Sequence, residues 1–123
     1  MEYMALIYGS EERLAGRSDE ERAELRKRYD AFTKEAQDAG VVVGGSELGA
    51  TRDATIVRVR DEETLVTDGP YAEVKEALGG YYLFECATVD EAVDWAARIP
   101  GALHGSIEVR PVYSDPRETE VQP

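Results

Sequence analysis

The chain has 123 residues, with 14 Lys and Arg against 26 Asp and Glu, which gives a formal net charge of −12. This length suits one domain. The acidic excess repels nucleic-acid phosphates and anionic membrane surfaces, so we expect neither as a partner. The single cysteine, Cys86, excludes an internal disulfide and a multi-cysteine metal site. No stretch has the composition of a signal peptide or the length of a membrane span, so the sequence predicts a cytoplasmic protein.

The first third of the chain predicts a strand, a helix and a second strand. Residues 3–8 are almost all apolar, as in a central strand that is covered on both faces. Ser18 and Glu21 have the spacing of a capping box and predict the start of a helix. Its apolar stripe consists of Leu25, Tyr29, Phe32 and Ala36. Gly40 is expected to end the helix, and the β-branched run 41–43 predicts a strand that Gly44 and Gly45 allow to bulge.

The middle of the chain predicts a loop and a hairpin. Residues 46–53 have the composition of a connecting loop. Residues 55–60 alternate with period two, and a second short run, residues 64–67, follows after Asp61, Glu62 and Glu63. We expect these two runs to pair as a β-hairpin with a turn of three to four residues.

The last third predicts a strand, a helix and a closing strand. In residues 80–87, Tyr82, Phe84 and Cys86 share one face. Thr88 and Glu91 repeat the capping-box spacing, and the helix that follows is expected to run to Pro100, with an apolar stripe formed by Val89, Ala92, Trp95, Ala96 and Ile99. Residues 106–112 alternate again, and Pro111 favours an edge position. The polar residues 114–123 predict a flexible tail after a domain of residues 1–113.

This order of elements predicts an α+β fold: a ferredoxin-like sandwich with a mostly antiparallel sheet and two main helices on one face. The strands carry apolar residues on both faces of the sheet: Leu83 and Phe84, for example, are expected to point to opposite faces. A second subunit packed against the face that the helices leave uncovered would bury the apolar residues there, so we expect a homodimer.

One segment, residues 67–83, is dense in residues with special backbone or chemical requirements. Asp68, Gly69 and Pro70 predict a turn, and a polar stretch leads from it to Gly79 and Gly80. Together with residues 4–8 and 105–111, this segment resembles the signature of the YCII-related, or DGPF-domain, family, with Tyr71 where the family name has Phe.

The resemblance covers roughly residues 1–113 and implies a dimeric α+β barrel with a cleft between sheet and loops. Some members of that family occur beside or fused to extracytoplasmic-function sigma factors, and a related branch includes dehalogenase-like enzymes. The wider group is associated with a His-Asp pair near the first helix. Residues 22–30 here contain no histidine, so that acid-base proposal does not transfer.

Three residues are candidates for catalysis, and each has a structural alternative. Asp68 is a candidate general base if burial raises its pKa, or the anchor of an Asx-turn. Lys75 would polarise a substrate, or form with Glu73 an ion pair that fixes the loop. His104, the only histidine, is a candidate proton relay, or a surface or interface residue.

The candidate substrate-binding residues are Tyr8, Tyr71, Glu73 and Tyr81. The tyrosines would line an aromatic pocket, or serve the core and the dimer interface. No spacing matches a metal site or a phosphate-binding loop, so we expect neither metal nor cofactor.

Two functions follow as hypotheses. The first is a small-molecule-binding dimer, in its enzymatic form a lyase, dehalogenase or isomerase acting on a compact, aromatic substrate. The second is a non-enzymatic accessory or regulatory module that binds a ligand or a sigma-factor-type protein.

Overall fold

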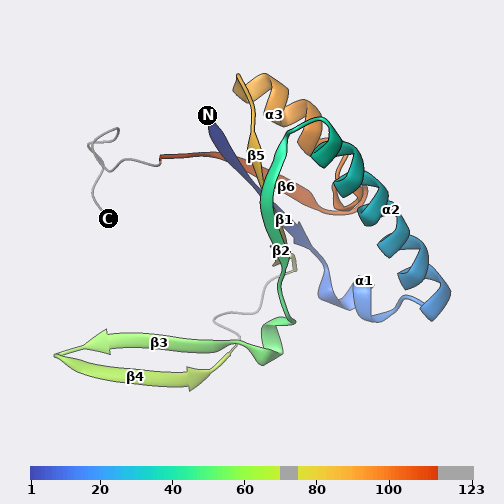
Figure 1. The fold of residues 1–123 in the computed structure, drawn as a ribbon. Helices are drawn as coiled ribbons and strands as arrows, with labels where there is room; N and C mark the ends of the chain where they lie inside the picture. Colours follow the sequence, from blue (N-terminus) through green and yellow to red (C-terminus); the bar gives the residue numbers. More distant parts are fainter. Residues whose placement is uncertain (70–74, 114–123) are drawn as a thin grey trace.

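The computed structural model describes residues 1–69 and 75–113 as a four-stranded antiparallel sheet, a separate two-stranded hairpin, and helices on one face of the sheet (Figure 1). In chain order the elements are β1 (Glu2–Gly9), α1 (Glu11–Ala15), α2 (Asp19–Asp38), β2 (Val42–Glu47), the 3₁₀ turn η1 (Thr51–Asp53), β3 (Thr55–Arg60), β4 (Glu63–Asp68), β5 (Ala77–Glu85), α3 (Val89–Ala96), the 3₁₀ turn η2 (Pro100–Leu103) and β6 (Ser106–Val112).

The large sheet has the strand order β2-β5-β1-β6, and each neighbouring pair is antiparallel. With α2 between β1 and β2, and α3 between β5 and β6, this is the ferredoxin-like α+β arrangement that the sequence predicts. β1 lies in the interior of the sheet and β6 at an edge, which confirms both expectations. Pro111 removes a backbone donor, and an edge strand tolerates that loss.

The core lies between the sheet and the helices. Phe84 and Ile99 are fully buried there, and Phe84 stacks on Tyr82 with ring centroids 5.9 Å apart. Phe32 of α2 meets Tyr82 edge-on at 5.3 Å and Trp95 of α3 at 6.3 Å. The predicted shared face of Tyr82, Phe84 and Cys86 is therefore the face toward the helices.

Helix α2 begins as the sequence predicts. The Ser18 hydroxyl accepts from the Glu21 amide at 3.1 Å, and the Glu21 carboxylate accepts from the Ser18 amide at 3.0 Å. These bonds satisfy two amides that have no partner within the helix. Past the end of α2, Gly40 adopts a φ of 75°, which favours glycine.

The cap of α3 differs in one bond from the prediction. Thr88 accepts from the Glu91 amide, but Glu91 accepts from the amide of Ala87 instead of Thr88. The apolar stripe is narrower than expected because Val89, in the first turn, is exposed. The helix ends at Ala96, and η2 continues the chain toward β6.

Several boundaries differ from the sequence prediction. β2 extends through Gly44 and Gly45 to Glu47, with the expected bulge between Val42 and Gly44, so the loop that follows it starts two residues later than predicted. β5 begins at Ala77, three residues early. The short helix α1 was not predicted. Ser10 caps it by accepting from the Arg13 amide.

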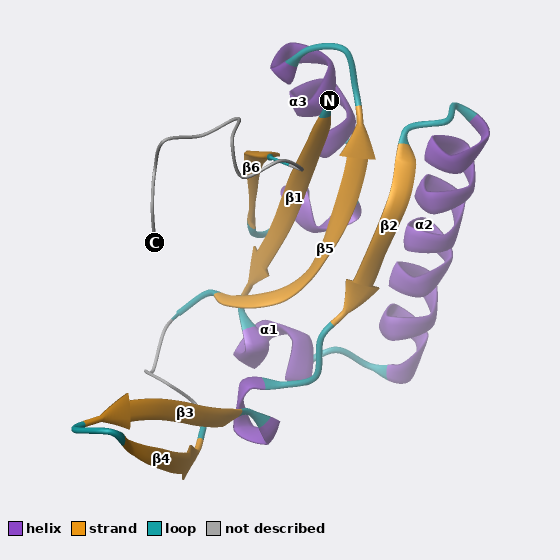
Figure 2. Cartoon of the chain, turned by 60° about the vertical axis from the view of Figure 1, so that its left-hand side comes forward, coloured by secondary structure: helices purple, strands orange, loops and turns teal. Residues whose placement is uncertain are grey.

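The hairpin β3–β4 is confirmed, but its turn is shorter than predicted. Arg60 pairs with Glu63, which leaves only Asp61 and Glu62 in the turn, both with positive φ. Such a two-residue turn matches the twist of the paired strands. The hairpin forms its own sheet and projects from the lower end of the large sheet on the side away from the helices (Figures 1 and 2).

Candidate functional site

The face of the large sheet that the helices leave uncovered is the main candidate for a site, and we call it the open face. Strand alternation and register place on it the side chains of β1, β5 and β6 that point away from the core. These residues are Glu2, Met4, Leu6, Tyr8, Tyr81, Leu83, Glu85, Ser106, Glu108, Arg110 and Val112. Its centre is apolar, because Met4 lies opposite Leu83 and Leu6 opposite Tyr81.

Polar groups gather at the end of the open face where β1 finishes. The Tyr8 hydroxyl donates to Glu108 Oε1 at 3.3 Å, although the two residues lie 100 positions apart in the chain. Partial burial, followed by the nearby Glu108 carboxylate, raises the pKa of Tyr8 above its usual value. Tyr8 is therefore a phenol at neutral pH and serves as a hydrogen-bond donor. Glu108 is exposed and serves as the acceptor.

The end of the motif segment, residues 67–83, forms the first part of β5, beside Tyr8 and Glu108. Ser106, paired with Tyr8 in the sheet, donates from Oγ to Glu76 Oε2 at 3.3 Å. Lys75 precedes Glu76 and is exposed. Tyr81 follows on β5 and is partly buried. The structure thus brings the predicted residues Tyr8 and Tyr81 to one face, and brings the end of the motif to the Tyr8 end of it.

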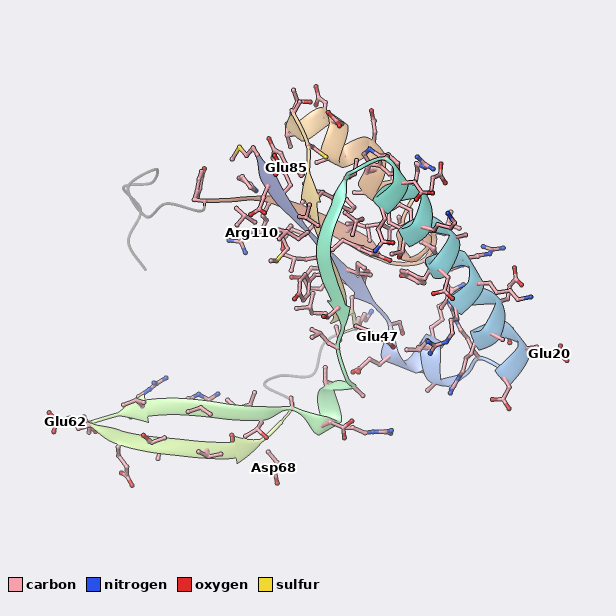
Figure 3. All side chains as sticks on the ribbon, viewed as in Figure 1. Glu20, Glu47, Glu62, Asp68, Glu85 and Arg110 are labelled. Carbon is pink, nitrogen blue, oxygen red and sulfur yellow. The ribbon has the colours of Figure 1, made fainter. Side chains whose placement is uncertain are left out.

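Asp68 does not join this group. It lies at the end of β4, is exposed, and in Figure 3 points away from the large sheet. Its neighbour Gly69 donates its amide to the Ala54 carbonyl at 2.5 Å, which closes the base of the hairpin. The predicted substrate-binding residues Tyr71 and Glu73 lie outside the residues that the structure describes.

His104 lies on the helix side of the sheet. It follows η2 and lines an open groove of about 560 Å³. The groove is lined by Arg13, Gly16, Arg17, Glu20, Glu21, Glu24, Leu25, Arg28, Pro100, Leu103 and His104. η2 thus directs His104 toward α1 and α2 and away from the open face, and its role as a proton relay stays a prediction.

Glu108 is the residue that sequence reasoning missed. The alternation of residues 106–112 separates Glu108 and Arg110 from Ile107 and Val109, but it does not identify their neighbours. Only the pairing of β1 with β6 places Glu108 beside Tyr8. Gly105 makes this approach possible, because it packs directly against the Tyr8 carbonyl.

The arrangement supports hydrogen bonding and proton transfer to a compact ligand. A phenol donor and a carboxylate acceptor stand beside the apolar surface of Leu6, which is the usual composition of a small-molecule site. Within residues 1–69 and 75–113, no three His, Cys, Asp or Glu side chains are grouped so that they would hold a metal ion. In the same part of the chain, no helix is long and apolar enough to cross a membrane.

The fold and the open face define a ferredoxin-like α+β domain with a hairpin inserted between its second and third sheet strands. The chain belongs to the YCII-related domain family, whose model matches residues 1–115. It is also 38% identical over 114 residues to an uncharacterized protein of Rhizobium meliloti (strain 1021), covering 91% of this chain and 92% of that protein. The resemblance seen in residues 67–83 is thereby confirmed.

Proposed function

We propose that the protein is a small-molecule-binding homodimer whose ligand lies on the open face beside Tyr8, Glu108 and Tyr81. The observation that carries the proposal is the Tyr8–Glu108 hydrogen bond at the edge of an apolar sheet surface. A second copy that covers this surface would exclude water from the ligand and bury the half-exposed side chains Met4, Leu6 and Leu83.

In its enzymatic form the site would catalyse proton transfer on a compact aromatic or carbonyl-containing substrate, as an isomerase, lyase or dehalogenase requires. Tyr8 remains protonated and would donate to a substrate oxygen. Glu108 would accept a proton from the substrate. Lys75, which precedes Glu76 at the Tyr8 end of the open face, would favour an anionic substrate group.

A thermal-shift screen with phenols and substituted benzoates tests this proposal. A ligand present at a hundred times its Kd stabilises the folded state by about 2.7 kcal/mol. For a domain of this size, that corresponds to a rise of roughly 10 °C in Tm. We expect at least one of these compounds to stabilise the wild-type protein. Tyr8→Phe removes the hydroxyl donor and Glu108→Gln removes the charge of the acceptor, so each should weaken binding about five- to tenfold.

Tyr113→Phe is the matched control, because Tyr113 is an exposed tyrosine one residue after β6. It should bind the same compound as tightly as the wild type does. Equal loss of affinity in Tyr113→Phe and Tyr8→Phe, or no stabilising compound in either class, would count against a ligand site on the open face.

A second candidate function is favoured by one feature, the exposed valines of the hairpin: Val57, Val59 and Val66. Clustered apolar side chains on a surface often mark a protein-binding site. They are the surface by which a non-enzymatic regulatory module would bind a sigma-factor-type protein. Two results together would favour this function over the first: a sigma-factor-type protein binds the wild type but not Val57→Ser, and no small molecule stabilises the protein.

A further inference from the structure

The hairpin β3–β4, residues 55–68, forms a two-stranded sheet that, in the part of the chain that the structure describes, is not joined to the large sheet, and we call it the arm. Figure 1 shows it projecting on the open-face side of the molecule, and ten of its twelve strand residues are exposed. A two-stranded ribbon alone is marginally stable in water. Its turn adds strain, since Asp61 and Glu62 both adopt positive φ. Packing against another surface would stabilise it.

The two faces of the arm differ in composition. Register places Val57 opposite Val66 and Val59 opposite Thr64, so one face carries Thr55, Val57, Val59, Thr64, Val66 and, at its base, Asp68. We call this the valine face. Val57, Val59 and Val66 are 61%, 59% and 62% exposed. The opposite face carries the charged residues Arg58, Arg60 and Glu63 together with Ile56, Leu65 and Thr67, so charge interrupts its apolar surface.

The valine face matches the open face in chemistry and size. Between its tip and Asp68 the valine face is uncharged, so it adds no charge of its own where it would cover the apolar side chains Met4, Leu6 and Leu83. Six residues per strand give a length of about 20 Å, and four strands in a sheet span about 15–20 Å. The arm is therefore long enough to cross the sheet.

We propose that the arm of one copy crosses the open face of a second copy, and that the second copy's arm does the same in return. Both surfaces belong to every chain, so one twofold contact covers both at once. Two ribbons about 20 Å long and 10 Å wide would bury on the order of 1,000 Å², near the lower limit of stable interfaces. The arm of one copy then covers the Tyr8–Glu108 end of the other copy's site, so each ligand site is incomplete in a single chain. The ligand role rests on the proposed function, whereas the contact itself does not.

A spin label at the tip of the arm tests the contact between copies. The spin label is attached to Glu62→Cys in a Cys86→Ala background, in chains that carry no isotope label. These chains are mixed with isotope-labelled wild-type chains. Broadening in the labelled chains then reports only contacts between copies. We expect the methyl signals of Met4, Leu6 and Leu83 to broaden, and those of Leu25 and Leu103 on the helix side to remain sharp. Broadening confined to the helix side, or none at all, overturns the proposal.

Valine substitutions give an independent measurement. Val57→Ser with Val66→Ser should raise the dissociation constant of the dimer at least tenfold, measured by light scattering over a dilution series. Val93→Ser on α3 is the control, because Val93 is 49% exposed and belongs to a helix on the covered face of the sheet. Equal effects in the two variants, or a wild-type mass equal to the 13.6 kDa of one chain at every concentration, contradict the proposal.

The two proposals fail separately. If the open-face methyls broaden but no phenol or benzoate binds, the arm contact stands and the ligand site fails. If a compound binds with the Tyr8 dependence described above but the open-face methyls stay sharp, the arm contact is overturned and the ligand site stands.

Discussion

Gly105→Ala should disturb the Tyr8 end of the site, because a methyl group at this position has no space. A Cβ built on Gly105 would lie far inside van der Waals contact with the Tyr8 carbonyl oxygen and 3.2 Å from the Gly9 Cα. Both neighbours are backbone atoms in β1, so either β1 or the start of β6 must move. Overpacking of this kind costs about 1–3 kcal/mol, and the loss of glycine flexibility in the unfolded chain offsets about 0.4–1 kcal/mol. We expect a net destabilisation of about 1–2 kcal/mol.

Gly9→Ala is the matched control, since a Cβ on Gly9 meets nothing within 4 Å. It should leave the free energy of unfolding unchanged or raise it slightly. Urea denaturation followed by circular dichroism, at one fixed protein concentration, measures both variants. Gly105→Ala should also lower the pKa of Tyr8 toward its usual value, followed by NMR of the ring, because Glu108 moves away. Equal stability of the two variants and an unchanged Tyr8 pKa would refute this reasoning.

Three further predictions concern the turn, the helix cap and a carboxylate. Glu62→Gly should relieve the positive φ in the hairpin turn and slow hydrogen exchange of the β3–β4 amides about two- to fivefold, as expected for a net gain of about 0.5–1 kcal/mol; faster exchange would contradict it. Ser18→Ala should lower the free energy of unfolding by about 1 kcal/mol, measured in urea, because the Glu21 amide loses its acceptor; no change would show that the cap is dispensable. Two hydrogen bonds from Thr51 lower the pKa of the Glu11 carboxyl below 4.5, so its stabilising contribution is complete above that pH and is lost as the pH falls through the lowered pKa. The stability difference between wild type and Glu11→Gln should therefore shrink on acidification, and a constant difference from pH 7 to pH 3 would contradict the assignment.

The sequence predicted well what depends on local pattern. The capping box at Ser18 and Glu21 and the alternation through Phe84 concern residues a few positions apart, so their outcome is decided within one element. The almost entirely apolar run of β1 likewise predicted its interior place in the sheet, because an interior strand excludes polar residues more completely than an edge strand does.

The sequence could not predict which strands pair with each other. The alternation of β3 and β4 identifies a hairpin, but whether that hairpin joins the large sheet depends on edges formed by residues far away in the chain. The contact between Tyr8 and Glu108 likewise follows from the β1–β6 register. The ordinary titration range of histidine makes His104 a candidate proton relay, but the sequence does not show that the path of η2 places this residue in the groove beside α1 and α2.

The most direct test of the ligand site is a map of where a bound compound lies. Signals from the tyrosine rings and from the Met and Leu methyl groups are recorded by NMR while the best benzoate or phenol from the screen is added. Our account predicts that the signals of Tyr8, Tyr81 and Leu6 shift in proportion to site occupancy while those of Leu25 and Leu103 stay fixed. Shifts confined to Leu25 and Leu103 would place the ligand in the groove beside His104 and contradict the assignment of the site to the open face.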